Sequence, residues 1–265
     1  MALTTEQLRL RDGKITASFA PSLMAGDESK IMREWKRLIG AEDYQEEDLS
    51  DSWPVQFGTW VEPFALDWHE RKTGIVLSRR GEVVTHPSMS HICCTLDAFR
   101  ADDRTVIDCK APGMWRKIDD VRSQYVPQMV VQRACVGADA AALLIVHGGS
   151  EPAEYPITWD TEYEAAVWER IAWFWDCVTS LSAPFVMAPV LAPTPAVKTY
   201  DMKESNAWAD KAAVWIANQA AAKAFESAAK DIKALVPADA QRAHGCGLNV
   251  TRAKNNALTI KGSEP

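Results

Sequence analysis

The chain has 265 residues, of which 47% are hydrophobic and 25% charged, and a formal net charge of −7; this composition is typical of a folded globular protein with a sizeable core. No run of 18 or more apolar residues occurs and the N-terminus, MALTTEQLRLRDGK, has no apolar h-region, so we expect neither a transmembrane helix nor a secretory signal. Six scattered cysteines without a C-x-x-C pair favour reduced, buried thiols and a cytoplasmic location over disulfides or a zinc site.

The charge is distributed unevenly. Residues 1–195 hold 19 basic and 29 acidic residues, a net charge of −10, whereas residues 196–265 hold 10 and 7, a net charge of +3. An acidic body argues against a nucleic-acid partner unless positive charge is concentrated locally or metal ions offset the acids. Several basic residues could line a DNA track: Arg33, Lys36, Arg37, Arg116, Lys117 and Arg122. A residue of this kind is more often an ordinary solvated surface charge.

The first 72 residues read as mainly helical. Thr16 or Ser18 could cap a short helix toward Met24. The predicted helices are 4–11, this short helix, 30–39 and 54–72, with an acidic loop at 41–52. The last helix is amphipathic, and its apolar residues recur at helical spacing: Phe57, Val61, Phe64, Ala65 and Trp68.

The next part of the chain mixes strands and helices. Strands are predicted at about 75–85, 92–99, 105–109, 139–148 and 154–159, and helices at 122–136 and 161–181. This order predicts an α/β fold with a central mixed β-sheet flanked by helices.

A proline- and alanine-rich stretch, SAPFVMAPVLAPTPAVKTY at 182–200, reads as an extended linker. We therefore divide the chain into a domain (1–185), a linker (186–203) and a C-terminal appendage (204–265). The appendage is predicted to hold a helix at 204–235, ended by Pro237, and a β-hairpin at 247–261. It could contact DNA or dock a protein, or its helix could be a solvated helix packed on the body.

The stretch HICCTLDAFRADDRTVIDCKAP, residues 91–112, reads as two strands around a polar turn, yet it carries Asp97, Asp108 and Lys110. If Asp102 and Asp103 form the turn, Ala98 lies opposite Ile107 on one face of the hairpin. Asp97 then lies opposite Asp108 on the other face, and directly opposed like charges destabilise a hairpin.

A divalent metal ion between the two acids would remove this repulsion. Two carboxylates and a main-chain carbonyl form an oxygen site suited to Mg²⁺ or Mn²⁺. Lys110 points to the same face as Asp108 and could position or deprotonate the attacking water. The alternative is an exposed hairpin face with ordinary solvated charges, and a register shifted by one residue would separate the acids.

The spacing of Asp97 and Asp108-Cys109-Lys110 resembles the PD-(D/E)XK nuclease signature. Three further blocks, RDGKITAS (11–18), FGTWVE (57–62) and YVPQMVVQ (125–132), narrow the resemblance to the lambda-type phage exonucleases, the YqaJ-like viral recombinase family. The blocks follow in that family's order, and the resemblance spans about residues 6–185. It implies a restriction-endonuclease-like core for the first domain.

The resemblance also implies roles for individual residues. Lys110, Asp97, Asp108, Glu62 and Gln128 would be catalytic, and the metal would be held by Asp97, Asp108, the Cys109 carbonyl and Glu62. The terminal 5′-phosphate of DNA would be bound by Arg11, Ser18 and, with less weight, Thr95.

The function implied is a Mg²⁺-dependent 5′-to-3′ exonuclease that acts on double-stranded DNA ends and leaves 3′ single-stranded tails for recombination by annealing. Mn²⁺ would substitute for Mg²⁺. The resemblance further implies a homotrimeric ring, a single-strand annealing protein as partner, and a phage or prophage origin, with action in the bacterial cytoplasm and no membrane partner. The alternatives are an iron–sulfur relative, a non-catalytic DNA-end or partner-binding module on the same fold, and a nuclease of different polarity.

Overall fold

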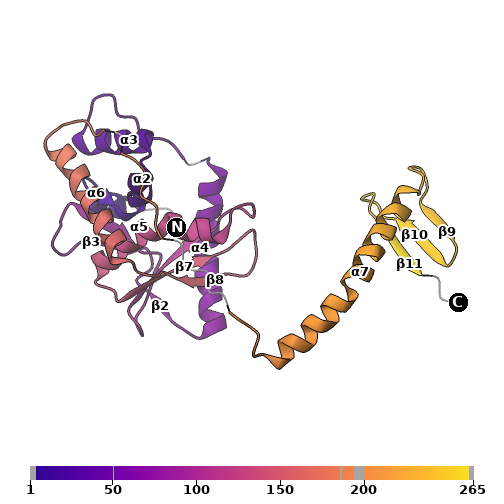
Figure 1. The fold of residues 1–265 in the computed structure, drawn as a ribbon. Helices are drawn as coiled ribbons and strands as arrows, with labels where there is room; N and C mark the ends of the chain where they lie inside the picture. The colour runs from indigo at the N-terminus through magenta and orange to yellow at the C-terminus, as the bar shows by residue number, and fades with distance from the viewer. Residues whose placement is uncertain (1–3, 50, 186, 194–199, 263–265) are drawn as a thin grey trace. The chain divides into compact units, whose positions relative to one another are not determined.

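The computed structural model describes residues 4–49, 51–185, 187–193 and 200–262. The chain divides into two compact units, Met1–Ala196 and Val197–Pro265, and Figure 1 traces both from the N-terminus to the C-terminus. None of the helices in these described segments is long and apolar enough to cross a membrane.

A five-stranded mixed sheet forms the centre of the first unit. Its strands, in spatial order, are β2 (Leu77–Ser78), β5 (Ala98–Arg100), β6 (Thr105–Lys110), β7 (Ala140–Ile145) and β8 (Ala153–Pro156). β6 and β7 are parallel, whereas the other neighbours are antiparallel. The predicted α/β fold with a central mixed sheet is therefore confirmed.

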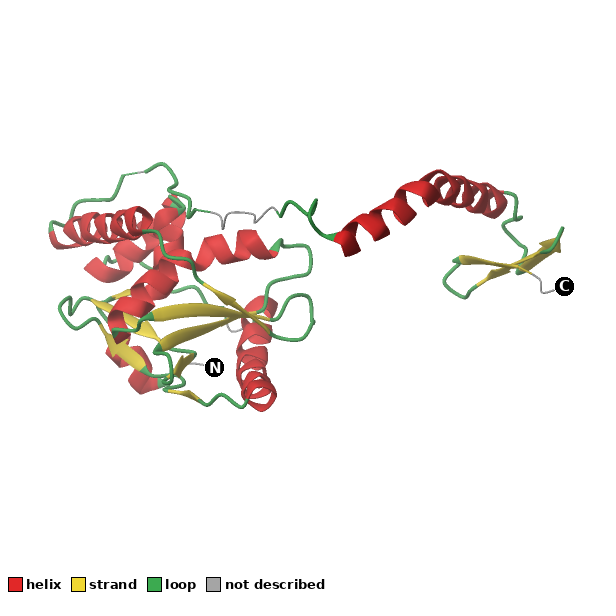
Figure 2. Cartoon of the chain, turned by 60° about the horizontal axis from the view of Figure 1, so that its bottom comes forward, coloured by secondary structure: helices red, strands yellow, loops and turns green. Residues whose placement is uncertain are grey.

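Helices cover both faces of this sheet (Figure 2). On one face, α4 (Trp53–Thr73) packs its residues Val61, Ala65 and Leu66 against strand residues such as Ile107 and Leu144. On the other face lie α5 (Ile118–Val136) and α6 (Thr161–Thr179). Because successive strand residues point to opposite faces, the neighbouring residues Val106, Leu143 and Ile145 belong to this second, larger core cluster.

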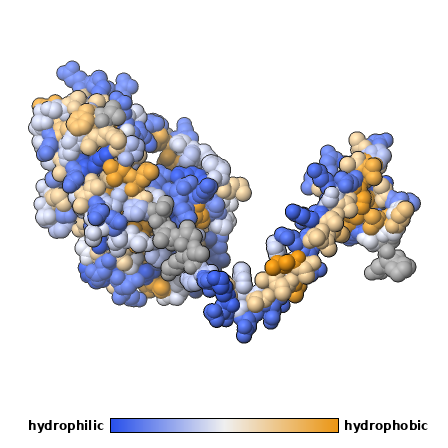
Figure 3. Space-filling model, viewed as in Figure 1, coloured by the Kyte–Doolittle hydropathy of each residue, from blue (hydrophilic) through white to orange (hydrophobic). Residues whose placement is uncertain are grey.

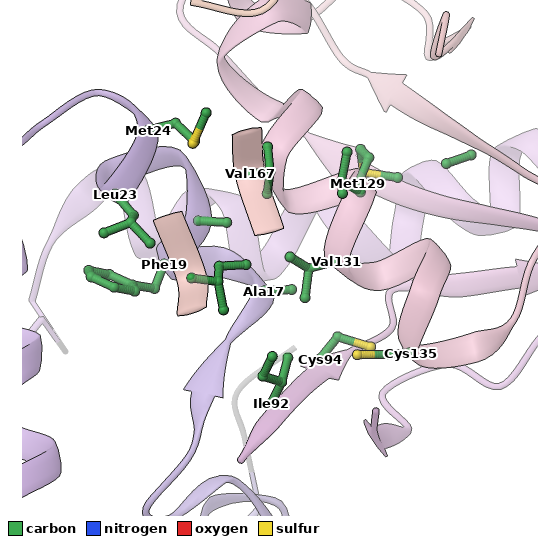
Figure 4. Packing of buried hydrophobic residues seen from close by; sticks show 14 of the residues in the cluster. Ala17, Phe19, Leu23, Met24, Ile92, Cys94, Met129, Val131, Cys135 and Val167 are labelled. Atoms are coloured by element: carbon green, nitrogen blue, oxygen red, sulfur yellow. The ribbon is translucent and has the colours of Figure 1, made fainter. Parts of the chain in front are cut away.

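The N-terminal elements extend the larger core. They are α1 (Thr5–Arg11), β1 (Ile15–Thr16), a 3₁₀ turn at Ala17–Phe19, α2 (Ala20–Met24) and α3 (Glu28–Ile39). Figure 4 shows Phe19, Leu23 and Met24 of this region packed near α5 and α6 residues such as Met129 and Val167. Thr16 precedes the 3₁₀ turn without making a capping bond, and its hydroxyl instead lies 3.0 Å from that of Ser18.

A second, three-stranded sheet has the order β1-β4-β3, with β3 at Val83–Thr85 and β4 at Ile92–Thr95. The predicted continuous strand 92–99 is wrong, because it breaks at Leu96 and Asp97 into β4 and β5, which lie in different sheets. The Leu96 backbone bonds outside both ladders: its N–H donates to the Glu82 carbonyl at 2.9 Å, and its carbonyl accepts from Gly81 at 2.7 Å. Asp97 is therefore held at the crossing between the sheets.

The predicted hairpin register is confirmed where the strands pair. Ala98 lies opposite Ile107, and the next two pairs keep the same register. The loop has four residues, 101–104, and Arg104 adopts a positive φ of 52°, so the two-residue turn was too short. The ladder ends before Asp97 and Asp108, which are not paired in it.

The predicted apolar stripe of α4 is only partly the packed face. Val61 and Ala65 are buried, but Phe64 and Trp68 are 53% and 37% exposed. Leu66 and His69 are buried in their place, because α4 is turned so that these two positions, rather than Phe64 and Trp68, meet the sheet.

Residues 188–192 of the predicted linker lie on the first unit. The N–H of Val190 donates to the Met24 carbonyl at 2.9 Å, and the Arg170 guanidinium donates to the carbonyls of Leu23 and Ala188. The linker prediction for residues 186 and 194–199 falls outside the described residues, and the proposed domain limits stay predictions.

The second unit contains α7 (Asn206–Ala234), β9 (Arg242–Gly245), β10 (Leu248–Arg252) and β11 (Leu258–Gly262). β10 and β11 form the predicted hairpin, and β9, which was not predicted, adds a third antiparallel strand. No residue of α7 is buried within the described chain, and Figure 3 shows apolar residues along the surface of this helix.

Candidate active site

The acids of the hairpin and Lys110 come together where the chain passes from β4 to β5, beside the C-terminal end of β6. Asp108 and Lys110 are two residues apart on β6 and so point to the same face. Asp108 is only 1% exposed. Lys110 Nζ lies 2.5 Å from Asp108 Oδ2, so the ammonium directly neutralises this buried carboxylate.

Two glutamines of α5 fix the other oxygen of Asp108. Gln128 Nε2 donates to Asp108 Oδ1 at 2.5 Å and Gln132 Nε2 donates to the same atom at 3.1 Å. The two glutamines are four residues apart and therefore share one face of the helix. Gln132 also lies 3.3 Å from the Thr95 carbonyl, which ties the β4 end to the same network.

Asp97 is held by the backbone of β6. Its Oδ2 accepts a hydrogen bond of 2.7 Å from the N–H of Cys109. Burial, followed by the charge of Asp108, raises the pKa of Asp97 to about 8. Burial and the nearby Asp108 thus disfavour the ionised form of Asp97.

Lys110 stays charged in this setting. Burial by itself would lower the pKa of Lys110, but the carboxylates of Asp108 and Asp97 outweigh it and raise that pKa. The ammonium also lies 4.6 Å from the ring centroid of Tyr125, a cation–π distance.

A cavity of about 240 Å³ joins these groups to the predicted phosphate ligands. Its wall includes Arg11, Ser18 and Thr95 from the N-terminal region and β4, and Arg11 Nη1 donates to Thr95 Oγ1 at 2.9 Å. The predicted catalytic residues that line the same cavity are Glu62, Asp97, Asp108, Lys110 and Gln128. The remaining predicted residue, Cys109, lines a neighbouring cavity.

The cavity also contains residues to which the sequence assigned no role in the site. Gln132 follows Gln128 by one helical turn, and that spacing was the signal available for it. Thr16 lies two residues before Ser18 in the block RDGKITAS, which was the signal for it, whereas Gln7 and Gly81 have no local signal because α1 and the loop before β3 reach the cavity only through the fold.

The residues present fit a small divalent cation. Among the described residues, no group of three or more His, Cys, Asp and Glu is arranged to hold a metal ion. Mg²⁺ does not need such a cage, because it binds through one or two carboxylates and keeps several waters. Asp97 and Asp108, with the Cys109 carbonyl, offer that oxygen set, and the raised pKa of Asp97 shows a site where added positive charge would be stabilising.

The chain is similar to known proteins in sequence and in fold. A family model described as the YqaJ-like viral recombinase domain matches residues 6–139. The crystal structure of an alkaline exonuclease from Laribacter hongkongensis aligns with a TM-score of 0.57 at 22% identity, over 68% of this chain and 94% of that chain. The structure of that exonuclease in complex with dAMP gives the same values. At this identity the likeness shows a shared fold, and no curated protein sequence matches the chain.

Proposed function

Because the chain belongs to the YqaJ-like viral recombinase domain family, we propose that it is a metal-dependent deoxyribonuclease, a 5′-to-3′ exonuclease of double-stranded DNA. The proposal includes Mg²⁺ as the metal, with Mn²⁺ able to replace it. One observation carries it: a single cavity contains both phosphate-type ligands, Arg11 and Ser18, and the acidic cluster of Asp97 and Asp108. The Laribacter hongkongensis protein of similar fold is described as an alkaline exonuclease, which supports the same class of reaction.

The phosphate side of the cavity would select the DNA end. A guanidinium donates two hydrogen bonds to a phosphate in a fixed geometry, and Arg11 is already oriented by its bond to Thr95. The hydroxyls of Ser18 and Thr95 line the same wall. A terminal 5′-phosphate held here would set the position of the next phosphodiester in the chain, so cleavage would proceed one nucleotide at a time.

The acidic side would carry out hydrolysis. A divalent metal ion held by Asp97, Asp108 and the Cys109 carbonyl, with Glu62 assisting, would supply Lewis-acid activation and neutralise charge on the phosphate. Gln128 and Gln132 fix the Asp108 carboxylate.

Lys110 lies next to this carboxylate, where its ammonium would stabilise the developing hydroxide.

The products would be 5′-mononucleotides and a duplex with a 3′ single-stranded tail. Such tails are substrates for annealing, so we extend the proposal to phage-type recombination with a single-strand annealing protein in the bacterial cytoplasm. A homotrimeric ring around DNA would keep the enzyme on its substrate. The support for these points is the family to which the chain belongs.

An end-labelled linear duplex tests the proposal. With Mg²⁺ we expect stepwise release of labelled mononucleotide from 5′-phosphorylated ends, slower release from 5′-hydroxyl ends, and none with EDTA. The Lys110→Gln variant, which keeps a donor for Asp108, should lose this activity, whereas Lys72→Ala, at an exposed lysine of α4, should retain it. Binding of the duplex without degradation in Mg²⁺ would instead indicate a DNA-end-binding module.

A further inference from the structure

A second cavity, of about 350 Å³, adjoins the catalytic one. The two cavities share Glu62, Asp97 and Lys110. Of these two cavities, only the first is lined by the proposed phosphate ligands Arg11, Ser18 and Thr95. The acidic cluster therefore lies between two separate spaces, only one of which is assigned to the DNA end.

We propose that the second cavity binds the nucleotide on the 3′ side of the scissile phosphate, and that Gly58 provides the room for it. This inference rests on the proposed exonuclease function. A 5′-phosphate in the first cavity places the first nucleotide there, and the scissile phosphate at Asp97 and Asp108. The strand must then leave on the other side of these acids, where the second cavity is the adjoining space.

The chemistry of the step agrees with this placement. The oxygen of water bonds to phosphorus while the bond from phosphorus to O3′ of the first nucleotide breaks, and that O3′ takes up a proton. The phosphate stays on O5′ of the second nucleotide. The new 5′-phosphate thus forms on the strand in the second cavity, one nucleotide away from the phosphate ligands of the first.

The lining of the second cavity suits a nucleotide. Its volume lies within the usual range for small-ligand sites. Tyr125 offers an aromatic ring on which a base can stack. Its cationic lining residues are Lys110 and Arg116. The Arg116 guanidinium donates a described hydrogen bond to the side chain of Gln124. In this proposal it binds the phosphate that follows the second nucleotide.

Gly58 explains why this space exists. It lies one helical turn before Glu62 on α4, in a helical conformation that does not require glycine, and a Cβ at this position would meet nothing within 4 Å. A glycine in a helix interior is destabilising relative to alanine by roughly 0.5–1 kcal/mol. Packing in the free protein does not require this glycine, whereas any side chain at position 58 would project into the cavity that Gly58 lines.

The test uses Gly58→Ala and Gly58→Leu, with Gln56→Leu at an exposed α4 position as the matched control. The substrates are 5′-phosphorylated duplexes whose cleaved strand has either a normal or an abasic second nucleotide, and a third duplex with the abasic residue at the fourth position. We expect Gly58→Leu to lower kcat/KM on the normal duplex by about 10- to 100-fold, as overpacking of a binding site does. An abasic residue at the second position should restore most of the lost kcat/KM, whereas one at the fourth position should not. Gly58→Ala should show the same pattern with a smaller loss.

The outcomes separate the two proposals. If wild-type protein leaves every duplex intact, the proposed function itself fails. If wild-type protein degrades DNA but folded Gly58→Leu does so at the same rate, or its loss is not relieved by the abasic second nucleotide, the inference is overturned. Should Gly58→Leu not fold, Gly58→Ala decides by the same relief criterion, with thermal unfolding as the check on folding.

A second measurement addresses Arg116. Arg116→Ala should raise KM for long duplexes, but not for a 5′-phosphorylated dinucleotide, because the dinucleotide ends before the phosphate that Arg116 would contact. An equal effect on both substrates would remove Arg116 from this site.

Discussion

Replacing Asp97 by asparagine should stabilise the metal-free protein while removing its proposed activity. The substitution keeps the size of the side chain, and the new amide oxygen can accept the hydrogen bond from the Cys109 N–H that Asp97 accepts now at 2.7 Å. What changes is the charge, which the folded protein disfavours because of burial and the neighbouring Asp108.

The magnitude follows from linkage. The pKa of Asp97 is about 8 in the folded chain and about 3.9 in an unfolded chain. Because the folded state binds the proton more tightly, its stability falls as pH rises from about 4 to about 8. At about 1.4 kcal/mol per unit the ceiling is roughly 6 kcal/mol. Because the Asp97 side chain is partly exposed and solvent relaxes around it, we expect about 2 to 4 kcal/mol.

Urea denaturation in EDTA at pH 5, 7 and 9 measures the effect. The free energy of unfolding of Asp97→Asn should exceed that of wild type by a margin that grows with pH. Asp103→Asn is the matched control on the same hairpin: Arg100 lowers the pKa of Asp103, so this substitution should destabilise slightly, by about 0.2–1 kcal/mol. An Asp97→Asn protein that is less stable than wild type at pH 9, or a difference independent of pH, would refute the account of the site.

Three further outcomes are expected. In thermal scans, Mn²⁺ or Mg²⁺ should raise the unfolding temperature of the wild-type protein by binding to the folded state. Asp108→Asn should remove most of that rise. An undiminished rise in this variant would mean that the metal binds elsewhere. Arg11→Ala should lower the preference for 5′-phosphorylated over 5′-hydroxyl ends by about 10- to 100-fold, the value of a charged hydrogen bond, in competition assays; an unchanged preference would exclude Arg11 from the phosphate site. Burial lowers the pKa of His91, whose ring stacks on that of Trp175 with the centroids 4.3 Å apart. The stability that neutral His91 contributes is therefore present above about pH 6.5 and lost as pH falls. His91→Phe should keep the stack and flatten the acid limb of a pH–stability curve, and an unchanged limb would show that other groups cause the acid limb.

The sequence predicted most helices of the first unit and the residue types of its site, but not where its strands begin and end. The order of strands and helices predicted a mixed α/β fold, because the spacing of apolar residues within a short segment already indicates a helix or a strand. The register of the 98–107 hairpin followed from a short turn between two strands, a contact of low sequence separation. Asp108 and Lys110 were placed on one face of β6 by the same period of two.

How these pieces meet depends on contacts between residues far apart in the chain. Arg11 and Thr95 are 84 positions apart, and nothing in the local pattern brings α1 to the end of β4. The break at Asp97 likewise arises because Leu96 bonds to the loop before β3, a long-range pairing that overrides the propensity for one continuous strand.

The second cavity is a product of the fold in the same way. Gly58 reads in the sequence as an unfavourable residue in a helix, and it stands four residues before Glu62 in the block FGTWVE that carries the family resemblance. Its place becomes clear when α4 packs beside β6 and leaves an open space there. Local patterns in the sequence predict which residues share a helix or strand face. The shape of a cavity depends on side chains from distant segments, and only folding brings these together.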